Sequence, residues 1–181
     1  IPAVLALAAT LLAAGCIHRH PTPGLIPAGV ARVDISPTHP VRLMGYAARA
    51  QQPAPTQVLQ PIHARALALG ADPEASVLIT IDNCILPAAV TDEVRRRLAR
   101  RVGLAPERIA LSVTHTHSAP CLTGAAPNIF ALEISAADQE AIDTYTRFFT
   151  DRLESVAIAA LKDRHPARLA GGWLHQDTVT G

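Results

Sequence analysis

The stretch from residue 76 to residue 114 constrains the fold of this chain more than any other part. Residues 76–82 and 108–114 are two mostly apolar runs, and the first has the character of a strand covered on both faces. Between them, residues 88–102 repeat an apolar side chain every fourth position, which predicts a helix with one apolar stripe from Val90 to Val102. A strand–helix–strand order predicts two parallel strands joined by a right-handed crossover.

The remaining patterns extend this unit into a larger sheet. A long helix is expected over 136–162, with Ser135 as its N-cap. Further strands are expected over 29–37 (with the pattern of an edge strand), 62–69 and 168–175. We therefore predict an α/β fold in which a mixed, largely parallel sheet is layered with helices. Because the chain begins at Ile1 and stops without a closing helix, we expect a partial domain cut at both ends.

Composition places the chain among globular proteins and excludes one class of partner. It has 181 residues, 49% of them hydrophobic, which suits one domain with a real core. The formal net charge is +1, so nothing in the charge balance favours nucleic acid. The arginines of 95–101 lack interleaved aromatic residues, and we interpret them as a solvated helix face.

The amino end has the pattern of an export signal. Residues 1–15 are apolar and rich in Ala and Leu, and small residues precede Cys16, as in a bacterial lipobox. The proline-rich segment 16–28 is typical of a tether. We therefore expect a lipoprotein signal peptide, lipidation at Cys16 and attachment to the membrane of the bacterial cell envelope through that anchor. The alternative for 1–15 is a buried core helix.

Two further cysteines follow predicted strand ends. An exported protein lies in an oxidising compartment, where Cys84 and Cys121 could form a disulfide. Two free thiols are the alternative, because sequence alone does not give the distance that such a bond needs.

Two histidines mark the candidate site. His115 and His117 follow directly on the strand 108–114, and residues two apart on an extended backbone point to the same side. Asp82 ends the neighbouring strand, and ligands in parallel sheets bind beyond the carboxyl ends of strands. We predict that the imidazoles bind a metal or polarise a substrate; the alternative is that they merely cap the strand end. Arg49 and Ser118 are weaker candidates for residues that line the site.

Residues 114–120, Thr-His-Thr-His-Ser-Ala-Pro, resemble the THTHSGP signature of the neutral/alkaline, non-lysosomal ceramidase family. Residues 29–37 resemble that family's opening G-x-A-x-x-D-I-T-P, and 45–49 resemble its G-Y-x-x-R. An A-R-A strand follows at 64–66, and Asp82 ends the next strand as in the family. Two positions depart from the pattern: Ala119 stands for a glycine and Leu59 for a histidine that many members have.

The resemblance implies a zinc-dependent amidase that cleaves the N-acyl bond of ceramide to a fatty acid and sphingosine. His115 would be a zinc ligand, and His117 would hydrogen-bond the reacting amide or its oxyanion. The family's other ligands, a histidine, a glutamate and a tyrosine, lie downstream of the signature. Residues 29–181 would therefore be the N-terminal part of a catalytic domain, inactive by itself.

Two other functions fit the same residues. One is a metal hydrolase of another fold, since His-x-His after a strand also occurs in amidohydrolase barrels and metallo-β-lactamase-like enzymes. The other is a lipid-anchored envelope binding protein with a vestigial metal site. Stoichiometric zinc in the purified protein would separate an enzyme from the binding protein.

Overall fold

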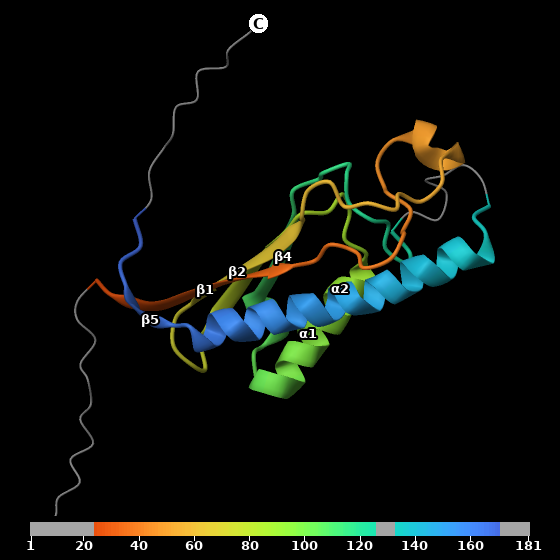
Figure 1. Cartoon of the computed structure of the whole chain (residues 1–181). Helices are drawn as coiled ribbons and strands as arrows, with labels where there is room; N and C mark the ends of the chain where they lie inside the picture. The colour runs from red at the N-terminus through yellow and green to blue at the C-terminus, as the bar shows by residue number, and fades with distance from the viewer. Residues whose placement is uncertain (1–23, 126–132, 171–181) are drawn as a thin grey trace, which may run out of the picture.

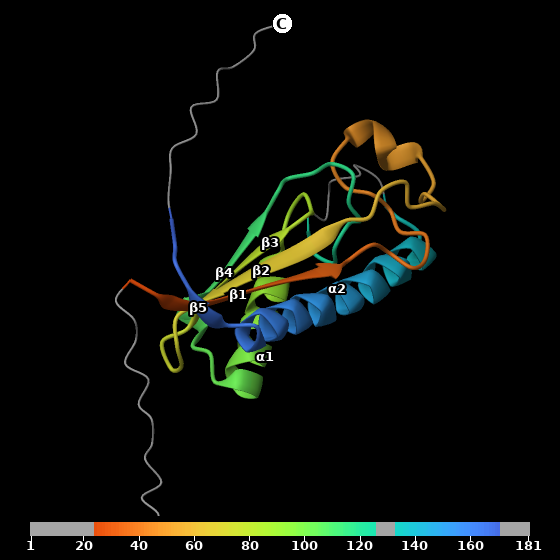
Figure 2. The same ribbon diagram turned by 60° about the vertical axis from the view of Figure 1, so that its left-hand side comes forward.

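The computed structural model describes residues 24–125 and 133–170, in which five strands form one sheet in the order β4-β3-β2-β1-β5. The strands are β1 (Ile26–Asp34), β2 (His63–Leu69), β3 (Ser76–Ile81), β4 (Ile109–Val113) and β5 (His165–Ala167). The helices are α1 (Ala88–Val102), α2 (Ala136–Lys162) and two short 3-10 helices, η1 (Ala47–Gln51) and η2 (Pro106–Arg108). Both α-helices lie on the same side of the sheet (Figures 1 and 2).

The predicted crossover unit is confirmed. β3 and β4 pair in parallel from Val77 opposite Ile109 to Ile81 opposite Val113, and α1 connects them. α1 ends at Gly103, which adopts the left-handed conformation with a φ of 69°. The carboxyl ends of β3 and β4 therefore lie side by side, and the segments after Ile81 and Val113 leave the sheet at the same end.

The mixed α/β sheet is also confirmed, but it is less parallel than expected. β1 pairs with β2, β2 with β3 and β1 with β5, all antiparallel. For β2 and β3 the reason is connection length, because the segment 70–75 that joins them is too short for a crossover between parallel strands. The one parallel pair, β3 and β4, is joined by the connection that contains α1.

α2 packs along β1 and β2 and supplies much of the core. Its N-cap is Ser135 as predicted, whose Oγ accepts the backbone N–H of Asp138 at 3.1 Å. The side chains that fill the space beneath the sheet are those of the predicted stripe, Ile142, Tyr145, Phe149, Leu153 and Val156. The helix approaches β1 so closely that a Cβ on Gly29 would lie 2.3 Å from the Ala160 carbonyl oxygen. A glycine is therefore required at this crossing.

Three local predictions need correction. Val102 is 43% exposed, because the last turn of α1 extends past the core that covers Val90, Val94 and Leu98. The last strand lies at 165–167 rather than starting at 168, since the chain pairs with residues 26–28 directly after α2; residues 171–175 lie outside the described residues. Because β5 pairs with residues 26–28, only the part of β1 after residue 28 lies at the edge of the sheet.

The face of the sheet away from the helices is uncovered among the described residues. Strand register places Val30, Leu67, Leu78 and Ala110 in one row across four strands on that face. Leu78 is 41% exposed and Val30 is 64% exposed, whereas Ile79 on the helix side is fully buried. β3 is therefore covered on one face in this part of the chain, not on both.

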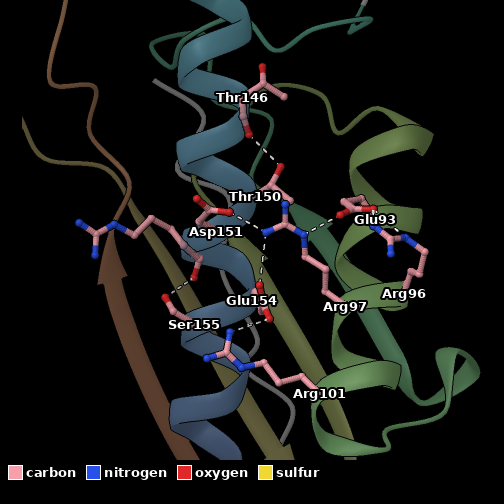
Figure 3. Close-up of polar contacts among 10 residues, drawn as sticks. Glu93, Arg96, Arg97, Arg101, Thr146, Thr150, Asp151, Glu154 and Ser155 are labelled. Carbon is pink, nitrogen blue, oxygen red and sulfur yellow. Dashed lines mark hydrogen bonds and ion pairs between the residues drawn. The ribbon is translucent and has the colours of Figure 1, made fainter.

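Ion pairs join α1 to α2. Figure 3 shows the Arg97 guanidinium reaching across from α1 to Asp151 and Glu154 on α2, with contacts of 2.6 and 3.3 Å. Arg101 also contacts Glu154, at 3.2 Å, and Glu93 binds both Arg96 and Arg97 on its own helix. The arginine run is thus only partly a solvated face, because Arg97 and Arg101 connect two helices.

Within residues 24–125 and 133–170, no helix has the length and apolar character needed to cross a membrane. The predicted signal segment 1–15 and Cys16 lie outside the described residues.

Candidate metal and amide-binding site

The two histidines lie in a turn, not on a continuing strand. β4 ends at Val113, the Thr114 N–H donates to the Ile81 carbonyl at 2.9 Å, and His115 adopts a φ of 59°. The expected reason for their convergence, alternation along a strand, is therefore wrong. The left-handed residue still turns the chain so that the rings of His115 and His117 lie 5.0 Å apart, at an interplanar angle of 69°.

The neighbouring strand end fixes the orientation of His115. Its Nδ1 lies 2.8 Å from the backbone carbonyl oxygen of Cys84, which follows β3. A carbonyl can only accept, so Nδ1 is the donor in this hydrogen bond, which leaves Nε2 as the nitrogen that could bind a metal. Hydrogen bonds of this kind hold the ring of metal-binding histidines in place.

Cys84 brings a third donor to the two histidines. The donor atoms of Cys84, His115 and His117 all lie within 4.8 Å of one another. Imidazole nitrogen and cysteine sulfur are ligand types that zinc favours in proteins, so a zinc ion bound by His115 fits the chemistry of this cluster, and the His117 donor atom lies within 4.8 Å of the His115 donor atom. Burial raises the pKa of the Cys84 thiol. Without a cation nearby, the thiol is therefore protonated at neutral pH.

The sequence pattern marks Cys84 only as a possible disulfide partner. The signal was present, because Cys84 follows the strand that pairs in parallel with the histidine strand. The disulfide itself is not formed: Cys84 and Cys121 are both buried free thiols. Desolvation raises the pKa of the Cys121 thiol to about 11.

Neighbouring segments hold the turn from both sides. Leu43 pairs with Pro120, and the Met44 N–H donates to the Ala119 carbonyl at 3.0 Å. From the other side, the buried Asn83 side chain donates to the Pro120 carbonyl at 3.3 Å and accepts the Cys84 N–H at 2.7 Å. Because these bonds join three loops, the histidine turn is fixed to the core rather than free at the surface.

Gly45 lies directly against His117. A Cβ built on Gly45 would lie 2.5 Å from the His117 Cβ and 2.6 Å from its Cγ, and the φ of Gly45 is +127°. No other residue fits this position without displacing the imidazole. The sequence resemblance contains this glycine, but spacing alone did not indicate its contact with His117.

The weaker candidates divide between the site and its surroundings. Arg49 donates from Nη1 to the backbone carbonyls of His117 and, at 3.3 Å, Met44, so it is not simply solvated. Asp82 lies at the end of β3, but its carboxylate accepts the His63 N–H at 3.0 Å and pairs with Arg65 at 3.1 Å. It is therefore engaged away from the two imidazoles.

A cavity of about 780 Å³ opens beside the turn. It is bounded by residues 37–43 and 55–62, and its polar lining includes Arg49, Asp82, Thr116 and Ser118. The imidazoles of His115 and His117 are not part of the lining, although the residues on either side of His117 are. A cavity of this size is within the range of sites that bind small organic molecules.

Comparison with known proteins agrees with the resemblance. A family model described as neutral/alkaline non-lysosomal ceramidase, N-terminal, matches residues 27–172. A solved structure of neutral ceramidase from Pseudomonas aeruginosa shares the fold, with 22% identity and a TM-score of 0.62 over 80% of this chain and 23% of its own. A structure described as ceramidase complexed with C2 gives 22% identity and a TM-score of 0.60, over 78% of this chain and 22% of that one.

No curated protein matches the chain. The chain spans less than a quarter of the length of each of these two solved structures. At 22% sequence identity, they support a shared fold and nothing more. The family match is stronger evidence than the two structures, because it covers well over half of the sequence and includes the turn with His115 and His117. On that ground, the chain belongs to the neutral/alkaline, non-lysosomal ceramidase family and corresponds to its N-terminal region.

Proposed function

We propose that the full-length protein carrying this chain is a zinc-dependent amide hydrolase. It cleaves the N-acyl bond of a ceramide-like lipid to a fatty acid and an amine such as sphingosine. The observation that carries this proposal is the joining of His115, His117 and Cys84 at the carboxyl ends of the parallel strands β3 and β4. Family membership supports the reaction class.

Each residue of the turn has a distinct part in this reaction. His115 would hold the metal through Nε2, while its Nδ1–H stays on the Cys84 carbonyl. His117 donates to the amide carbonyl and to the oxyanion that forms as the amide is attacked. Donors of this kind are worth about 3–4 kcal/mol of transition-state stabilisation. The zinc ion, when bound, supplies an activated water at neutral pH and polarises the amide carbonyl.

The cavity beside the turn supports a lipid as the substrate. Val41, Leu43 and Val58 give it apolar walls, and Thr116 and Ser118 place hydroxyl groups at the end nearest His117. A hydrocarbon chain against the apolar walls would leave its polar amide end at the turn. The substitutions Ala119 and Leu59 bear on which N-acyl lipid is preferred, not on the reaction class.

The test is hydrolysis of a fluorescent N-acyl sphingosine by the purified full-length protein. Turnover should disappear with a chelator, return with added zinc and be lost in His115→Ala. His165→Ala is the matched control, because its Nδ1 also lies 2.8 Å from a backbone carbonyl, that of Asp163, outside the site. Chelator-resistant turnover would refute the proposal. Absence of both turnover and stoichiometric zinc would instead favour an envelope binding protein with a vestigial site.

Anchoring at Cys16 is a separate part of the proposal. It is supported by the apolar segment 1–15 and by the proline-containing sequence that separates it from the start of β1 at Ile26. Incorporation of a labelled fatty acid into the bacterially expressed protein, and its loss in Cys16→Ser, would test it. Equal labelling of both proteins would contradict lipidation at this residue.

A further inference from the structure

We propose that Tyr46 and Arg49 are positioning residues that fix the imidazole of His117. The inference rests on the proposed function only in the role that it gives to His117. The geometric claim, that these two side chains determine where the ring lies, stands on contacts in the described residues.

Arg49 holds the backbone of His117. Its Nη1 donates to the His117 carbonyl and also to the Met44 carbonyl at 3.3 Å, so one guanidinium group joins the histidine turn to the loop before η1. Hydrogen bonds from a charged donor are roughly twice as strong as neutral ones. Among the described residues, Arg49 is the recorded partner of the His117 carbonyl, which no strand ladder satisfies.

Tyr46 holds the ring itself. Its ring centroid lies 4.9 Å from that of His117 at an interplanar angle of 71°, an edge-to-face contact. The His115 ring makes a similar contact, with 5.0 Å between the two ring centroids, and the backbone of Gly45 lies directly against the Cβ of His117. The imidazole is therefore confined by three neighbours, which removes most of its freedom to change rotamer.

Arg49 and Tyr46 act as a unit. The Arg49 guanidinium carbon lies 4.8 Å from the Tyr46 ring centroid, within the range of a cation–π interaction. Tyr46 remains 57% exposed, so packing in the core does not explain its place. Within the described part of the chain, its ring contacts are with His117 and Arg49. The exposure of Tyr46 and its two ring contacts both indicate that it positions His117 rather than stabilises the core.

The experiment compares variants of the full-length protein that remove or keep each contact. Arg49→Gln removes the charged donor and Tyr46→Leu removes the ring, whereas Tyr46→Phe keeps the ring. Arg95→Gln is the matched control, because Arg95 also donates to a backbone carbonyl, that of Ile109 at 3.1 and 3.3 Å, away from the site. Two quantities are measured: the His117 ring signals in ¹⁵N-edited NMR spectra, and kcat and KM for the amide substrate.

The proposal expects the His117 ring signals to shift or broaden in Arg49→Gln and Tyr46→Leu but not in Tyr46→Phe or Arg95→Gln. It expects kcat to fall by up to about a hundredfold in the first two variants with KM unchanged, as for a misplaced catalytic group. Wild-type ring signals in Arg49→Gln would overturn it, and so would a raised KM with unchanged kcat, which would mark Arg49 as a substrate contact. If the wild-type protein hydrolyses no amide, the proposed function fails while the NMR comparison still decides this inference.

Discussion

Gly45 is the position at which the site tolerates least change. Its left-handed backbone and its contact with His117 are both incompatible with a Cβ. A substitution at Gly45 would therefore disturb both the local backbone and the position of the His117 imidazole.

Gly45→Ala should lower the free energy of unfolding by about 2–3 kcal/mol, the upper part of the range for a strained backbone residue. It should also abolish amide hydrolysis, because the added methyl group displaces His117. Urea unfolding and the hydrolysis assay measure the two effects.

Gly124→Ala is the control for Gly45→Ala. Gly124 also has a positive φ, 73°, but no atom of the described residues lies within 4 Å of a Cβ built on it. Its cost should be about 1 kcal/mol, with full activity retained. Equal losses of activity in the two variants would contradict the contact with His117.

Sequence and structure agree on which residues meet, but not on why. The pair His115 and His117 could be predicted because both follow an apolar strand in a parallel unit. The left-handed turn at His115 could not be predicted, because a local sequence pattern does not show that the strand ends at Val113. The nearness of Cys84 depends on strand pairing and so on tertiary structure.

At the scale of elements, α1 and α2 were predictable to the residue, because apolar periodicity and caps are local signals. The sheet was less predictable, since strand order and direction depend on the lengths of connections and on long-range pairing. The ion pairs between the helices illustrate the same limit: periodicity marks Arg97 as polar but does not show that α2 faces it.

Arg97→Ala should lower the free energy of unfolding by about 1–2 kcal/mol, because the buried Glu154 would then keep only the more exposed Arg101 as a partner among the described residues. Arg96→Ala is the control, since Arg96 pairs, within residues 24–125 and 133–170, with Glu93 on its own helix and is half-exposed. Its cost should stay below about 0.5 kcal/mol. Chemical denaturation measures both, and equal costs would contradict a stabilising contact between α1 and α2.

At the scale of the whole molecule, stability should depend on pH through two carboxylates. Ser36 lowers the pKa of Asp34 by side-chain and backbone hydrogen bonds, and Arg96 and Arg97 lower the pKa of Glu93. A lowered pKa in the folded state means that the unfolded chain binds protons more readily. The stabilisation is therefore complete above the unfolded pKa, about 4, and is lost as the pH falls through the folded value.

The free energy of unfolding should thus decline from about pH 5 downwards. In Glu93→Gln the decline should be shallower, because one of the two groups no longer titrates. Urea titrations at a series of pH values would show this, and identical slopes in the variant and the wild type would refute the contribution of Glu93.

Among the described residues, the sheet has one buried face and one open face. Two adjacent residues of β3, Ile79 and Leu78, lie on these opposite faces. Ile79→Ala, on the helix side, should cost about 2–5 kcal/mol, whereas Leu78→Ala, on the open side, should cost less than about 1 kcal/mol. The unfolding midpoints of the two variants in the 181-residue chain give the comparison. Similar costs would mean that the open face is covered.

The central claim is that the two histidines of one turn have different tasks, and metal content measured together with turnover tests it most directly. The full-length wild-type protein, His115→Ala, His117→Ala and the control His165→Ala would each be analysed for zinc per chain and for amide hydrolysis. We predict that His115→Ala loses both zinc and turnover, that His117→Ala keeps zinc but loses turnover, and that His165→Ala keeps both. Full zinc and full turnover in His115→Ala would contradict the account.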